Sequence, residues 1–415
     1  MNKRKLPDMP AISLFFAMVV LALVMVFMPG ARPYDDTPSR GLKKLYLTLN
    51  GFELDDIKEL PRGTEFTGNS GVLTVRDKEQ FELSEVTLKG RGNSTWSQDK
   101  APLLLKTDNK VDLLDTSKSR KWVLLANYFD DSNIRNAIGL DIARALGMPY
   151  TVNGDFVELY ADGEYRGLYY MTEKVEIGKG RVDLREPDGV LVERRTSARS
   201  DSGDICYRVI ESLCFVVSDL VAKDNEAESM ASFTNDFMKV ERAIDAGDYN
   251  TIKKYVDTRS AAQYYLLSEI TVDPDAYLTS QFLYRDGADD LIHFGPGWDF
   301  DFALGNVRWV WTDDEDYLSP TALSKNIPEG NFFEKLLGFD EFQAEAKELY
   351  NSTIRLRRDE ILNAAKREAD RISLPAMVNN IWWDMKDYKT EVKLLLDWLE
   401  TRLNYLDGVF SEVVE

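Results

Sequence analysis

The densest group of side chains able to do chemistry lies in residues 269–305, which hold eight Asp and Glu residues and one basic residue, Arg285. Two of these acids, Asp299 and Asp301, alternate with aromatic residues between glycines and a proline. Burying rings beside carboxylates makes each unpaired charge costly, and a divalent cation offsets that cost. Asp299 and Asp301 are therefore predicted to bind Mg2+ through oxygen. The alternative is an Asp-rich loop that caps a helix or accepts hydrogen bonds from backbone amides.

A third acid, Asp275, lies between a predicted helix and a predicted strand. An Asp at this place can accept or align the proton of an incoming hydroxyl, so we predict that Asp275 is catalytic. Ser280 or Gln281, a few residues further on, would add an oxygen near the metal. The alternative for Asp275 is a turn residue after Pro274. Glu269, on the preceding helix, is expected to be structural.

A glycine-rich segment, residues 89–96, has the composition of an anion-binding loop. Arg91 supplies a guanidinium group, and the backbone amides around Gly92 and Asn93 can donate to phosphate oxygens. The segment therefore predicts a polyphosphate site. The same pattern also fits a plain hairpin turn with Gly90 and Gly92.

Two charged residues on predicted strands are further candidates for this site. Lys106 ends the apolar run 100–106, where its ammonium group would point into a cleft and bind phosphate. The alternative is a lysine on a solvated strand face. Glu173 ends another predicted strand and would orient Lys106 or contact the nucleotide base.

The composition excludes several classes of chemistry. The chain has one histidine, His293, and two cysteines, Cys206 and Cys214, which is too few for histidine-rich zinc sites, four-cysteine sites or iron–sulfur clusters. The net charge of −20 opposes general binding of nucleic acid. The two cysteines flank a predicted strand and turn, where they either form a disulfide in an oxidising compartment or remain buried thiols.

The N-terminus has the pattern of a targeting segment. Lys3, Arg4 and Lys5 precede an uncharged run of 18 residues, residues 11–28. This run is longer than the ~7–15 residues of a signal-peptide core and barely long enough to span a bilayer. We interpret residues 1–30 as an uncleaved membrane anchor with the body on the extracytoplasmic side; cleavage after Ala31 would give a secreted protein.

The elements that must position these residues change type along the chain. After a linker at residues 31–41, residues 42–225 read mostly as strands: 45–49, 85–89, 103–106, 122–126, 156–160, 167–171 and 190–193. One helix, residues 133–146, interrupts them. Residues 226–415 read as helices at 226–246, 258–270, 340–372 and 386–411, with a short strand pair at 281–284 and 291–294. The pattern predicts an α+β protein with a strand-rich nucleotide-binding lobe and a helix-rich lobe that carries the aspartates.

These segments, in this order, resemble the spore-coat protein H (CotH) kinase family. The resemblance runs from about residue 42 to residue 306 and rests on residues 91–96, 100–106, 122–128 with Asp131, Arg135 and Asn136, 163–167 with Glu173, Asp275, and 295–306. It implies an atypical protein-kinase-like fold that binds ATP with Mg2+ or Mn2+ and transfers phosphate to Ser or Thr of secreted or surface proteins.

The resemblance also implies roles for single residues. Asp275 would be the catalytic aspartate, Asp299 or Asp301 the metal aspartate and Lys106 the phosphate-binding lysine. Protein kinases place an Asn five residues after the catalytic Asp, where this chain has Ser280, so a second metal would be bound weakly or not at all.

Two other classes of function remain open from the residues alone. In a glycoside hydrolase, Asp275 with Asp299 or Glu269 would form the pair of carboxylates, but Lys106 and the glycine-rich segment would have no role. In a surface adhesion or assembly protein, the same fold would persist without turnover.

Overall fold

The computed structural model describes residues 41–411 apart from residues 62, 76–78, 93–94, 97, 197–204, 211–212, 277–278, 307–318 and 322–330. The chain divides into two units, residues 1–38 and 39–415, and every described residue belongs to the second. The predicted anchor, residues 1–30, lies outside the described residues. None of the helices within the described ranges combines the length and apolar character needed to cross a bilayer.

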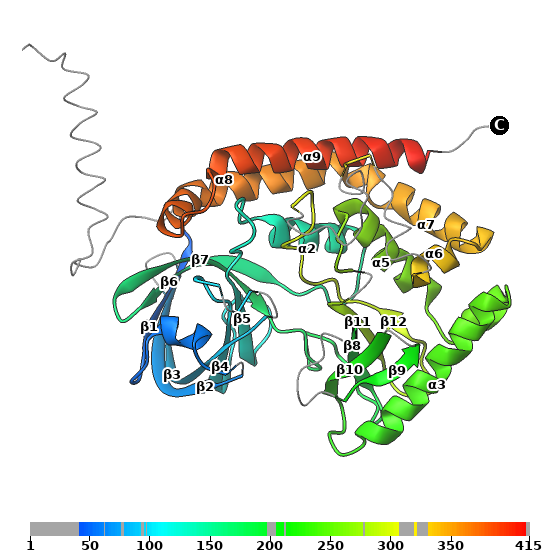
Figure 1. Ribbon diagram of the computed structural model, residues 1–415, viewed down its shortest axis with the longest axis horizontal. Coiled ribbons are helices and arrows are strands. Elements are labelled where there is room, and N and C mark those ends of the chain that lie inside the picture. The colour runs from blue at the N-terminus through cyan, green and yellow to red at the C-terminus, as the bar shows by residue number, and fades with distance from the viewer. Residues whose placement is uncertain are drawn as a thin grey trace, which may run out of the picture. The chain divides into compact units, whose positions relative to one another are not determined.

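Seven strands near the N-terminus close into a barrel in the order β1-β2-β3-β4-β5-β7-β6. They are β1 (Lys43–Thr48), β2 (Glu65–Val75), β3 (Glu79–Gly90), β4 (Leu103–Val111), β5 (Ser119–Leu125), β6 (Gly154–Ala161) and β7 (Glu164–Glu173). Neighbouring strands are antiparallel except β1 and β6, whose parallel pairing closes the barrel. Alternate side chains of each strand fill the interior, as Leu103 and Leu105 of β4 do. The barrel is on the left in Figure 1.

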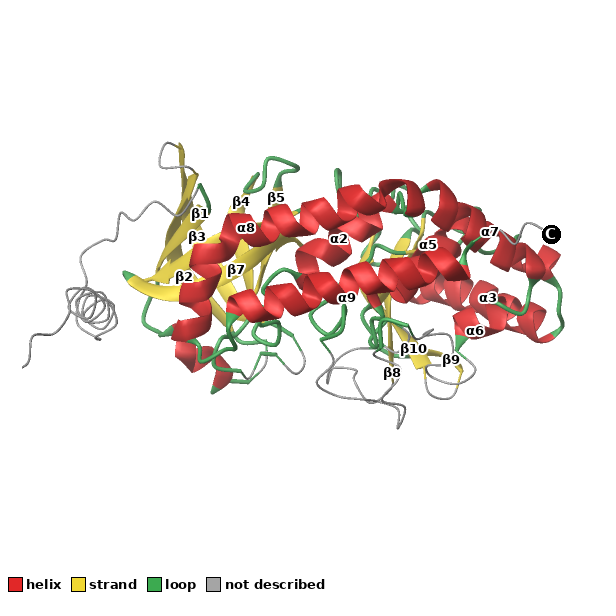
Figure 2. Cartoon of the chain, turned by 90° about the horizontal axis from the view of Figure 1, so that it is seen from above, coloured by secondary structure: helices red, strands yellow, loops and turns green. Residues whose placement is uncertain are grey.

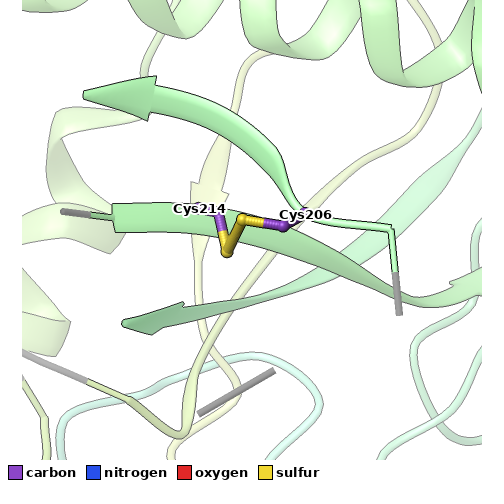
Figure 3. The surroundings of a disulfide bond; sticks show 2 residues. All are labelled: Cys206 and Cys214. Carbon is purple, nitrogen blue, oxygen red and sulfur yellow. A yellow bond between two sulfur atoms is a disulfide. The ribbon is translucent and has the colours of Figure 1, made fainter. Parts of the chain in front are cut away.

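A second, five-stranded sheet has the order β12-β11-β8-β10-β9. It contains β8 (Val190–Thr196), β9 (Tyr207–Ile210), β10 (Leu213–Leu220), β11 (Gln281–Arg285) and β12 (His293–Phe294). Strand β8 pairs with β11, so the sheet takes strands from both sides of residue 225, where the sequence suggested a change of lobe. Cys206, just before β9, forms a disulfide with Cys214 of β10 (Figure 3).

Helices cover the second sheet and extend along the barrel. They are α2 (Arg135–Ala145), α3 (Glu226–Asp245), α4 (Tyr249–Ile252), α5 (Thr258–Thr271), α6 (Phe332–Leu336), α7 (Asp340–Ser352), α8 (Arg358–Trp382) and α9 (Tyr388–Val409), with short 3-10 turns η1 (Leu54–Lys58) and η5 (Arg355–Arg357). Helices α8 and α9 lie side by side in both views, and α8 contacts β7 of the barrel (Figures 1 and 2). Helix α5 is buried along nearly its whole length and forms the centre of the larger core.

The mixed α+β class, with strands first and helices later, is confirmed. One predicted helix is wrong in its extent, because residues 340–372 are divided among α7, η5 and α8. The chain turns at this break around the fully buried Ile354. Helix α8 then continues through Pro375, which removes one backbone donor but does not end the helix.

Candidate functional site

Two adjoining cavities lie between the barrel and the second sheet. The outer cavity has a volume of about 480 Å3 and the inner one about 150 Å3. Six residues line both cavities: Arg91, Gly92, Glu193, Arg195, Phe282 and Trp298. Because these residues are shared, the two cavities form one continuous cleft, with walls from both sheets.

The inner cavity brings together acids that are far apart in the sequence. Asp275, Asp299 and Asp301 line it, with Thr279 and Ser280 beside them and Arg91 and Gly92 at its border with the outer cavity. The structure thus gathers six of the predicted site residues: Arg91, Gly92, Asp275, Ser280, Asp299 and Asp301. Asn93, the other predicted member of the glycine-rich loop, lies outside the described residues.

Negative charge accumulates at the inner cavity. Burial raises the pKa of Asp301 well above its usual range, and the charges of Asp299, Asp275, Asp273 and Asp130 raise it further. Burial also raises the pKa of Asp273, with the charge of Asp275 adding to the effect. Buried carboxylates close to one another either take up a proton or are compensated by positive charge, and Arg91 and Arg195 of the same lining supply part of that charge.

The two acidic loops are held by short-range hydrogen bonds. The Asp275 amide donates to Asp273 Oδ1 at 3.0 Å, so an Asp two residues earlier fixes the turn. The Ser280 hydroxyl donates to Asp299 Oδ2 at 3.0 Å. Both Ser280 and Asp299 have positive φ, at 55° and 71°. Ser280 therefore orients Asp299, which the sequence did not indicate.

Helix α2 positions the loop that carries Asp299 and Asp301. Asn136 accepts a hydrogen bond from the Phe300 amide at 3.0 Å and donates to Asn127 at 3.1 Å. Asn306 donates to the Asp301 carbonyl at 2.6 Å and to the Phe129 carbonyl at 2.8 Å. The side-chain amides of Asn136 and Asn306 thus fix the backbone between the two aspartates and directly after Asp301.

A glycine permits the close approach of this loop to α2. The buried ring of Phe300 packs directly on Gly139, and a Cβ atom at that position would overlap the ring. Phe300 lies between Asp299 and Asp301 in the sequence, so its packing determines where both carboxylates point.

A buried ion pair stiffens the start of α2. Arg135 Nη1 lies 2.5 Å from Asp130 Oδ1, and Arg135 Nε donates to the Leu304 carbonyl at 3.4 Å. The pair joins the segment before α2 to the metal-candidate loop and does not line either cavity, which makes it part of the packing.

The glycine-rich segment enters the cleft from the barrel. The Arg91 amide donates to the Pro102 carbonyl at 3.1 Å, which holds the chain after β3 against the start of β4. Gly92 has a φ of +94°, and a Cβ atom there would overlap Thr95 Oγ1. The Arg91 guanidinium lies over the Trp298 ring at 5.2 Å. The turn itself therefore requires glycine at position 92.

Two of the predicted residues are not in the cleft. Lys106 and Leu104 share the outer face of β4; Leu104 lines the outer cavity, but Lys106 lies further along the strand, half-exposed, 4.0 Å from Glu65. Glu173 is buried, and its carboxylate accepts hydrogen bonds from Thr116, Ser117 and Asn153. The structure does not pair Lys106 with Glu173, because each has other partners, and a contact of Glu173 with the nucleotide base stays a prediction.

Sequence reasoning missed four charged residues that line the cleft: Lys89, Lys174, Glu193 and Arg195. Burial lowers the pKa of Lys174, which follows β7 directly. Glu193 and Arg195 are two residues apart on β8 and so point to the same face. The two-residue spacing could have indicated that Glu193 and Arg195 share one face of a strand. The sequence alone does not show that this face lines the cleft.

Glu269 lies apart from the cavities. It is fully buried and forms an ion pair with the equally buried Arg402 of α9, with Glu269 Oε2 3.0 Å from Arg402 Nη2. The expectation that Glu269 is structural agrees with this contact. A pair of hydrolytic carboxylates made from Asp275 and Glu269 has no support.

The comparisons with known proteins point to one family. A family model described as CotH kinase protein matches residues 88–406. This range contains Arg91, Asp275, Asp299 and Asp301. No curated protein matches the chain.

Proposed function

Because the chain belongs to the CotH kinase protein family, we propose that it is a metal-dependent protein kinase that transfers the γ-phosphate of ATP to Ser or Thr hydroxyls of secreted or surface proteins. One observation carries the proposal: Arg91 and Gly92 from the barrel meet Asp275, Asp299 and Asp301 in a single cleft. The barrel and the helical part would then correspond to the two lobes of an atypical protein-kinase-like fold.

The inner cavity suits a cation held by few protein ligands. Across the described residues, no three His, Cys, Asp or Glu side chains converge closely enough to enclose a metal ion by themselves. Mg2+ commonly uses one or two carboxylates and completes its shell with water and substrate phosphates, and Mn2+ accepts the same oxygen donors. Asp299 and Asp301 would hold the ion, which when bound neutralises charge on the phosphates. The hydrogen bond from Ser280 to Asp299 supports an orienting role for Ser280.

The outer cavity suits the rest of the nucleotide. Leu104, Val123, Val175 and Phe282 provide apolar surface for a planar base. Arg91 and the glycine-rich turn lie where this cavity meets the acidic one, which is where phosphates joining a base to a metal would run. Lys89 and Lys174 also line the outer cavity, and their ammonium groups would supply the positive charge beside the phosphates that was predicted for Lys106.

Asp275 is the group proposed to act on the acceptor. It lies in the inner cavity with Asp299, and the Asp273 carboxylate fixes its backbone. Asp275 aligns the Ser or Thr hydroxyl and receives its proton as the oxygen bonds to the γ-phosphorus. The bond from that phosphorus to the bridging oxygen breaks, and ADP leaves.

We further propose that the catalytic body is extracytoplasmic, anchored through residues 11–28 or released if this segment is cleaved. The basic residues before the apolar run support this orientation. The disulfide between Cys206 and Cys214 supports an oxidising compartment.

The test is incorporation of labelled γ-phosphate into the purified protein and into dephosphorylated casein, with Mg2+ or Mn2+. We expect labelling by the wild type and none by Asp275→Asn or Asp299→Asn, because each loses a carboxylate of the inner cavity. Asp289→Asn is the matched control, since it removes an exposed carboxylate of the same segment. Continued labelling by both cavity variants would contradict the assignment, and a folded wild type that never labels would favour an adhesive or assembly role.

A further inference from the structure

The outer cavity is positively charged in a protein that is strongly negative overall. Lys89, Arg91, Lys174 and Arg195 line it, with Glu193 as the acidic residue among them. The whole chain carries a net charge of −20. Such a local reversal of sign attracts an anionic ligand.

Arg195 is held in this cavity by its neighbour on the same strand. Its Nη2 atom lies 2.7 Å from Glu193 Oε2, and both side chains are only about one-sixth exposed, at 16% and 15%. Arg194, on the opposite face of β8, is buried and donates to Gln281 at 3.2 Å. The alternation of β8 therefore directs Arg195, and not Arg194, to the cleft.

Arg91 provides a second guanidinium group at the same border. It comes from the barrel, whereas Arg195 comes from the second sheet, and both line both cavities. Stacking on Trp298 restrains Arg91 much as Glu193 restrains Arg195. The guanidinium groups of Arg91 and Arg195 are thus both restrained, and both lie where the outer cavity meets the inner cavity with its carboxylates.

We propose that Arg195, positioned by Glu193, is a phosphate-binding residue that with Arg91 clamps the β- and γ-phosphates of the nucleotide. The inference rests on the proposed kinase function and assigns part of its nucleotide site to β8. A guanidinium group presents two parallel N–H donors to phosphate oxygens, which an ammonium group cannot do. The clamp supplies positive charge opposite Asp299 and Asp301.

Nucleotide affinities of variants of the full chain test this assignment. Competition against a fluorescent adenine nucleotide, with Mn2+ present, gives the affinities for ATP and AMP. In Arg195→Met we expect ATP to bind at least about tenfold more weakly and AMP to be almost unaffected, because AMP lacks the clamped phosphates. Arg195→Lys should recover part of the loss, and Glu193→Gln should lose less than Arg195→Met.

The control is Arg185→Met, which removes an exposed positive charge outside the cavities. It should keep the wild-type ratio of ATP to AMP affinity, and unfolding without nucleotide should show that every variant folds. An unchanged ratio in Arg195→Met, or an equal loss for both nucleotides, would overturn the clamp while leaving the proposed function intact. A wild type that binds neither nucleotide would instead refute the proposed function and the clamp with it.

Discussion

At the residue scale, the cleft is marked by carboxylates that are costly to bury. Asp273 and Asp301 have raised pKa values because burial and neighbouring acids disfavour their charged forms. Their local partners, such as the amide of Asp275, offset only part of this cost. A bound cation would reduce the repulsion between these carboxylates and so stabilise the folded protein. The same cation would also attract the phosphates of a nucleotide, so we expect metal and nucleotide binding to be coupled.

The sole histidine gives a pH prediction at the same scale. Burial alone would lower the pKa of His293, but Asp257 at 3.0 Å and Asp290 at 3.3 Å together raise it. A raised pKa means that the stabilising charge is fully present below about pH 6.5 and is lost as the pH rises through the higher folded-state value. We expect the unfolding midpoint of His293→Gln to lie below that of the wild type at pH 5.5, with the gap narrowing by pH 9. A constant gap would show that the charge of His293 does not stabilise the fold.

A site residue could be predicted from the sequence only where its immediate neighbours in the chain indicate its role. Asp299 and Asp301 carry a local signal, since carboxylates between aromatic rings are unusual, and Asp275 follows a clear helix. Lys106 had only a strand pattern, and alternation cannot say whether a lysine meets a cleft or, as here, Glu65 of β2, which lies two strands away in the barrel. Arg195 depends on the pairing of β8 with β11, which brings together residues about 90 positions apart.

At the element scale, the site depends on how closely one loop approaches one helix. Asn136 binds the loop backbone, and Gly139 leaves room for Phe300. The hydrogen bond to Asn136 and the packing of Phe300 on Gly139 therefore fix the position of the loop on α2, and both contacts lie within one turn of the helix.

Gly139→Ala tests this fit. The added methyl group must displace Phe300, and overpacking of this kind costs about 1–3 kcal/mol. We expect a lower unfolding midpoint and weaker binding of Mn2+ and ATP, because Asp299 and Asp301 move with the ring. Gly408→Ala in α9 is the control: it makes the same change in a helix where nothing lies within 4 Å, and should be neutral or slightly stabilising. Equal behaviour of the two variants would argue against a positioning role for Phe300.

The elements themselves were more predictable than their pairing. Most barrel strands, and helices α2, α3, α5 and α9, follow from apolar periodicity. Strand β2 was missed because Gly68, Gly71 and polar residues break its alternation. The parallel contact of β1 with β6 joins Leu45 to Leu159, and no local pattern encodes it.

At the scale of the whole folded unit, α5 joins the second sheet to the surrounding helices, through contacts with β12, α2, α7 and α9. It is buried on all sides, ends just before Asp273, and is tied to α9 through Glu269 and Arg402. Arg402 donates to the Glu269 carbonyl as well as to its carboxylate. Helix α9 thus supports the helix that leads to the loop carrying Asp273 and Asp275.

Breaking this tie should destabilise the unit as a whole. Arg402→Met leaves the Glu269 carboxylate buried without its ion-pair partner, and we expect a loss of about 3–5 kcal/mol in urea unfolding. Replacing both residues, as Glu269→Met with Arg402→Met, removes the uncompensated charge and should cost less than the single change. If the double variant were as unstable as the sum of the two single variants, the ion pair would not be the source of the effect.

Thermal unfolding with each ligand alone and with both together tests the proposal that one cleft binds a metal ion and a nucleotide. The protein is heated alone, with Mn2+, with ATP and with both, alongside Asp299→Asn and Asp301→Asn. We predict a clear rise of the midpoint for the wild type only when both ligands are present, and little or no rise for the variants. No rise with both ligands, or the same rise in the two variants, would contradict the account.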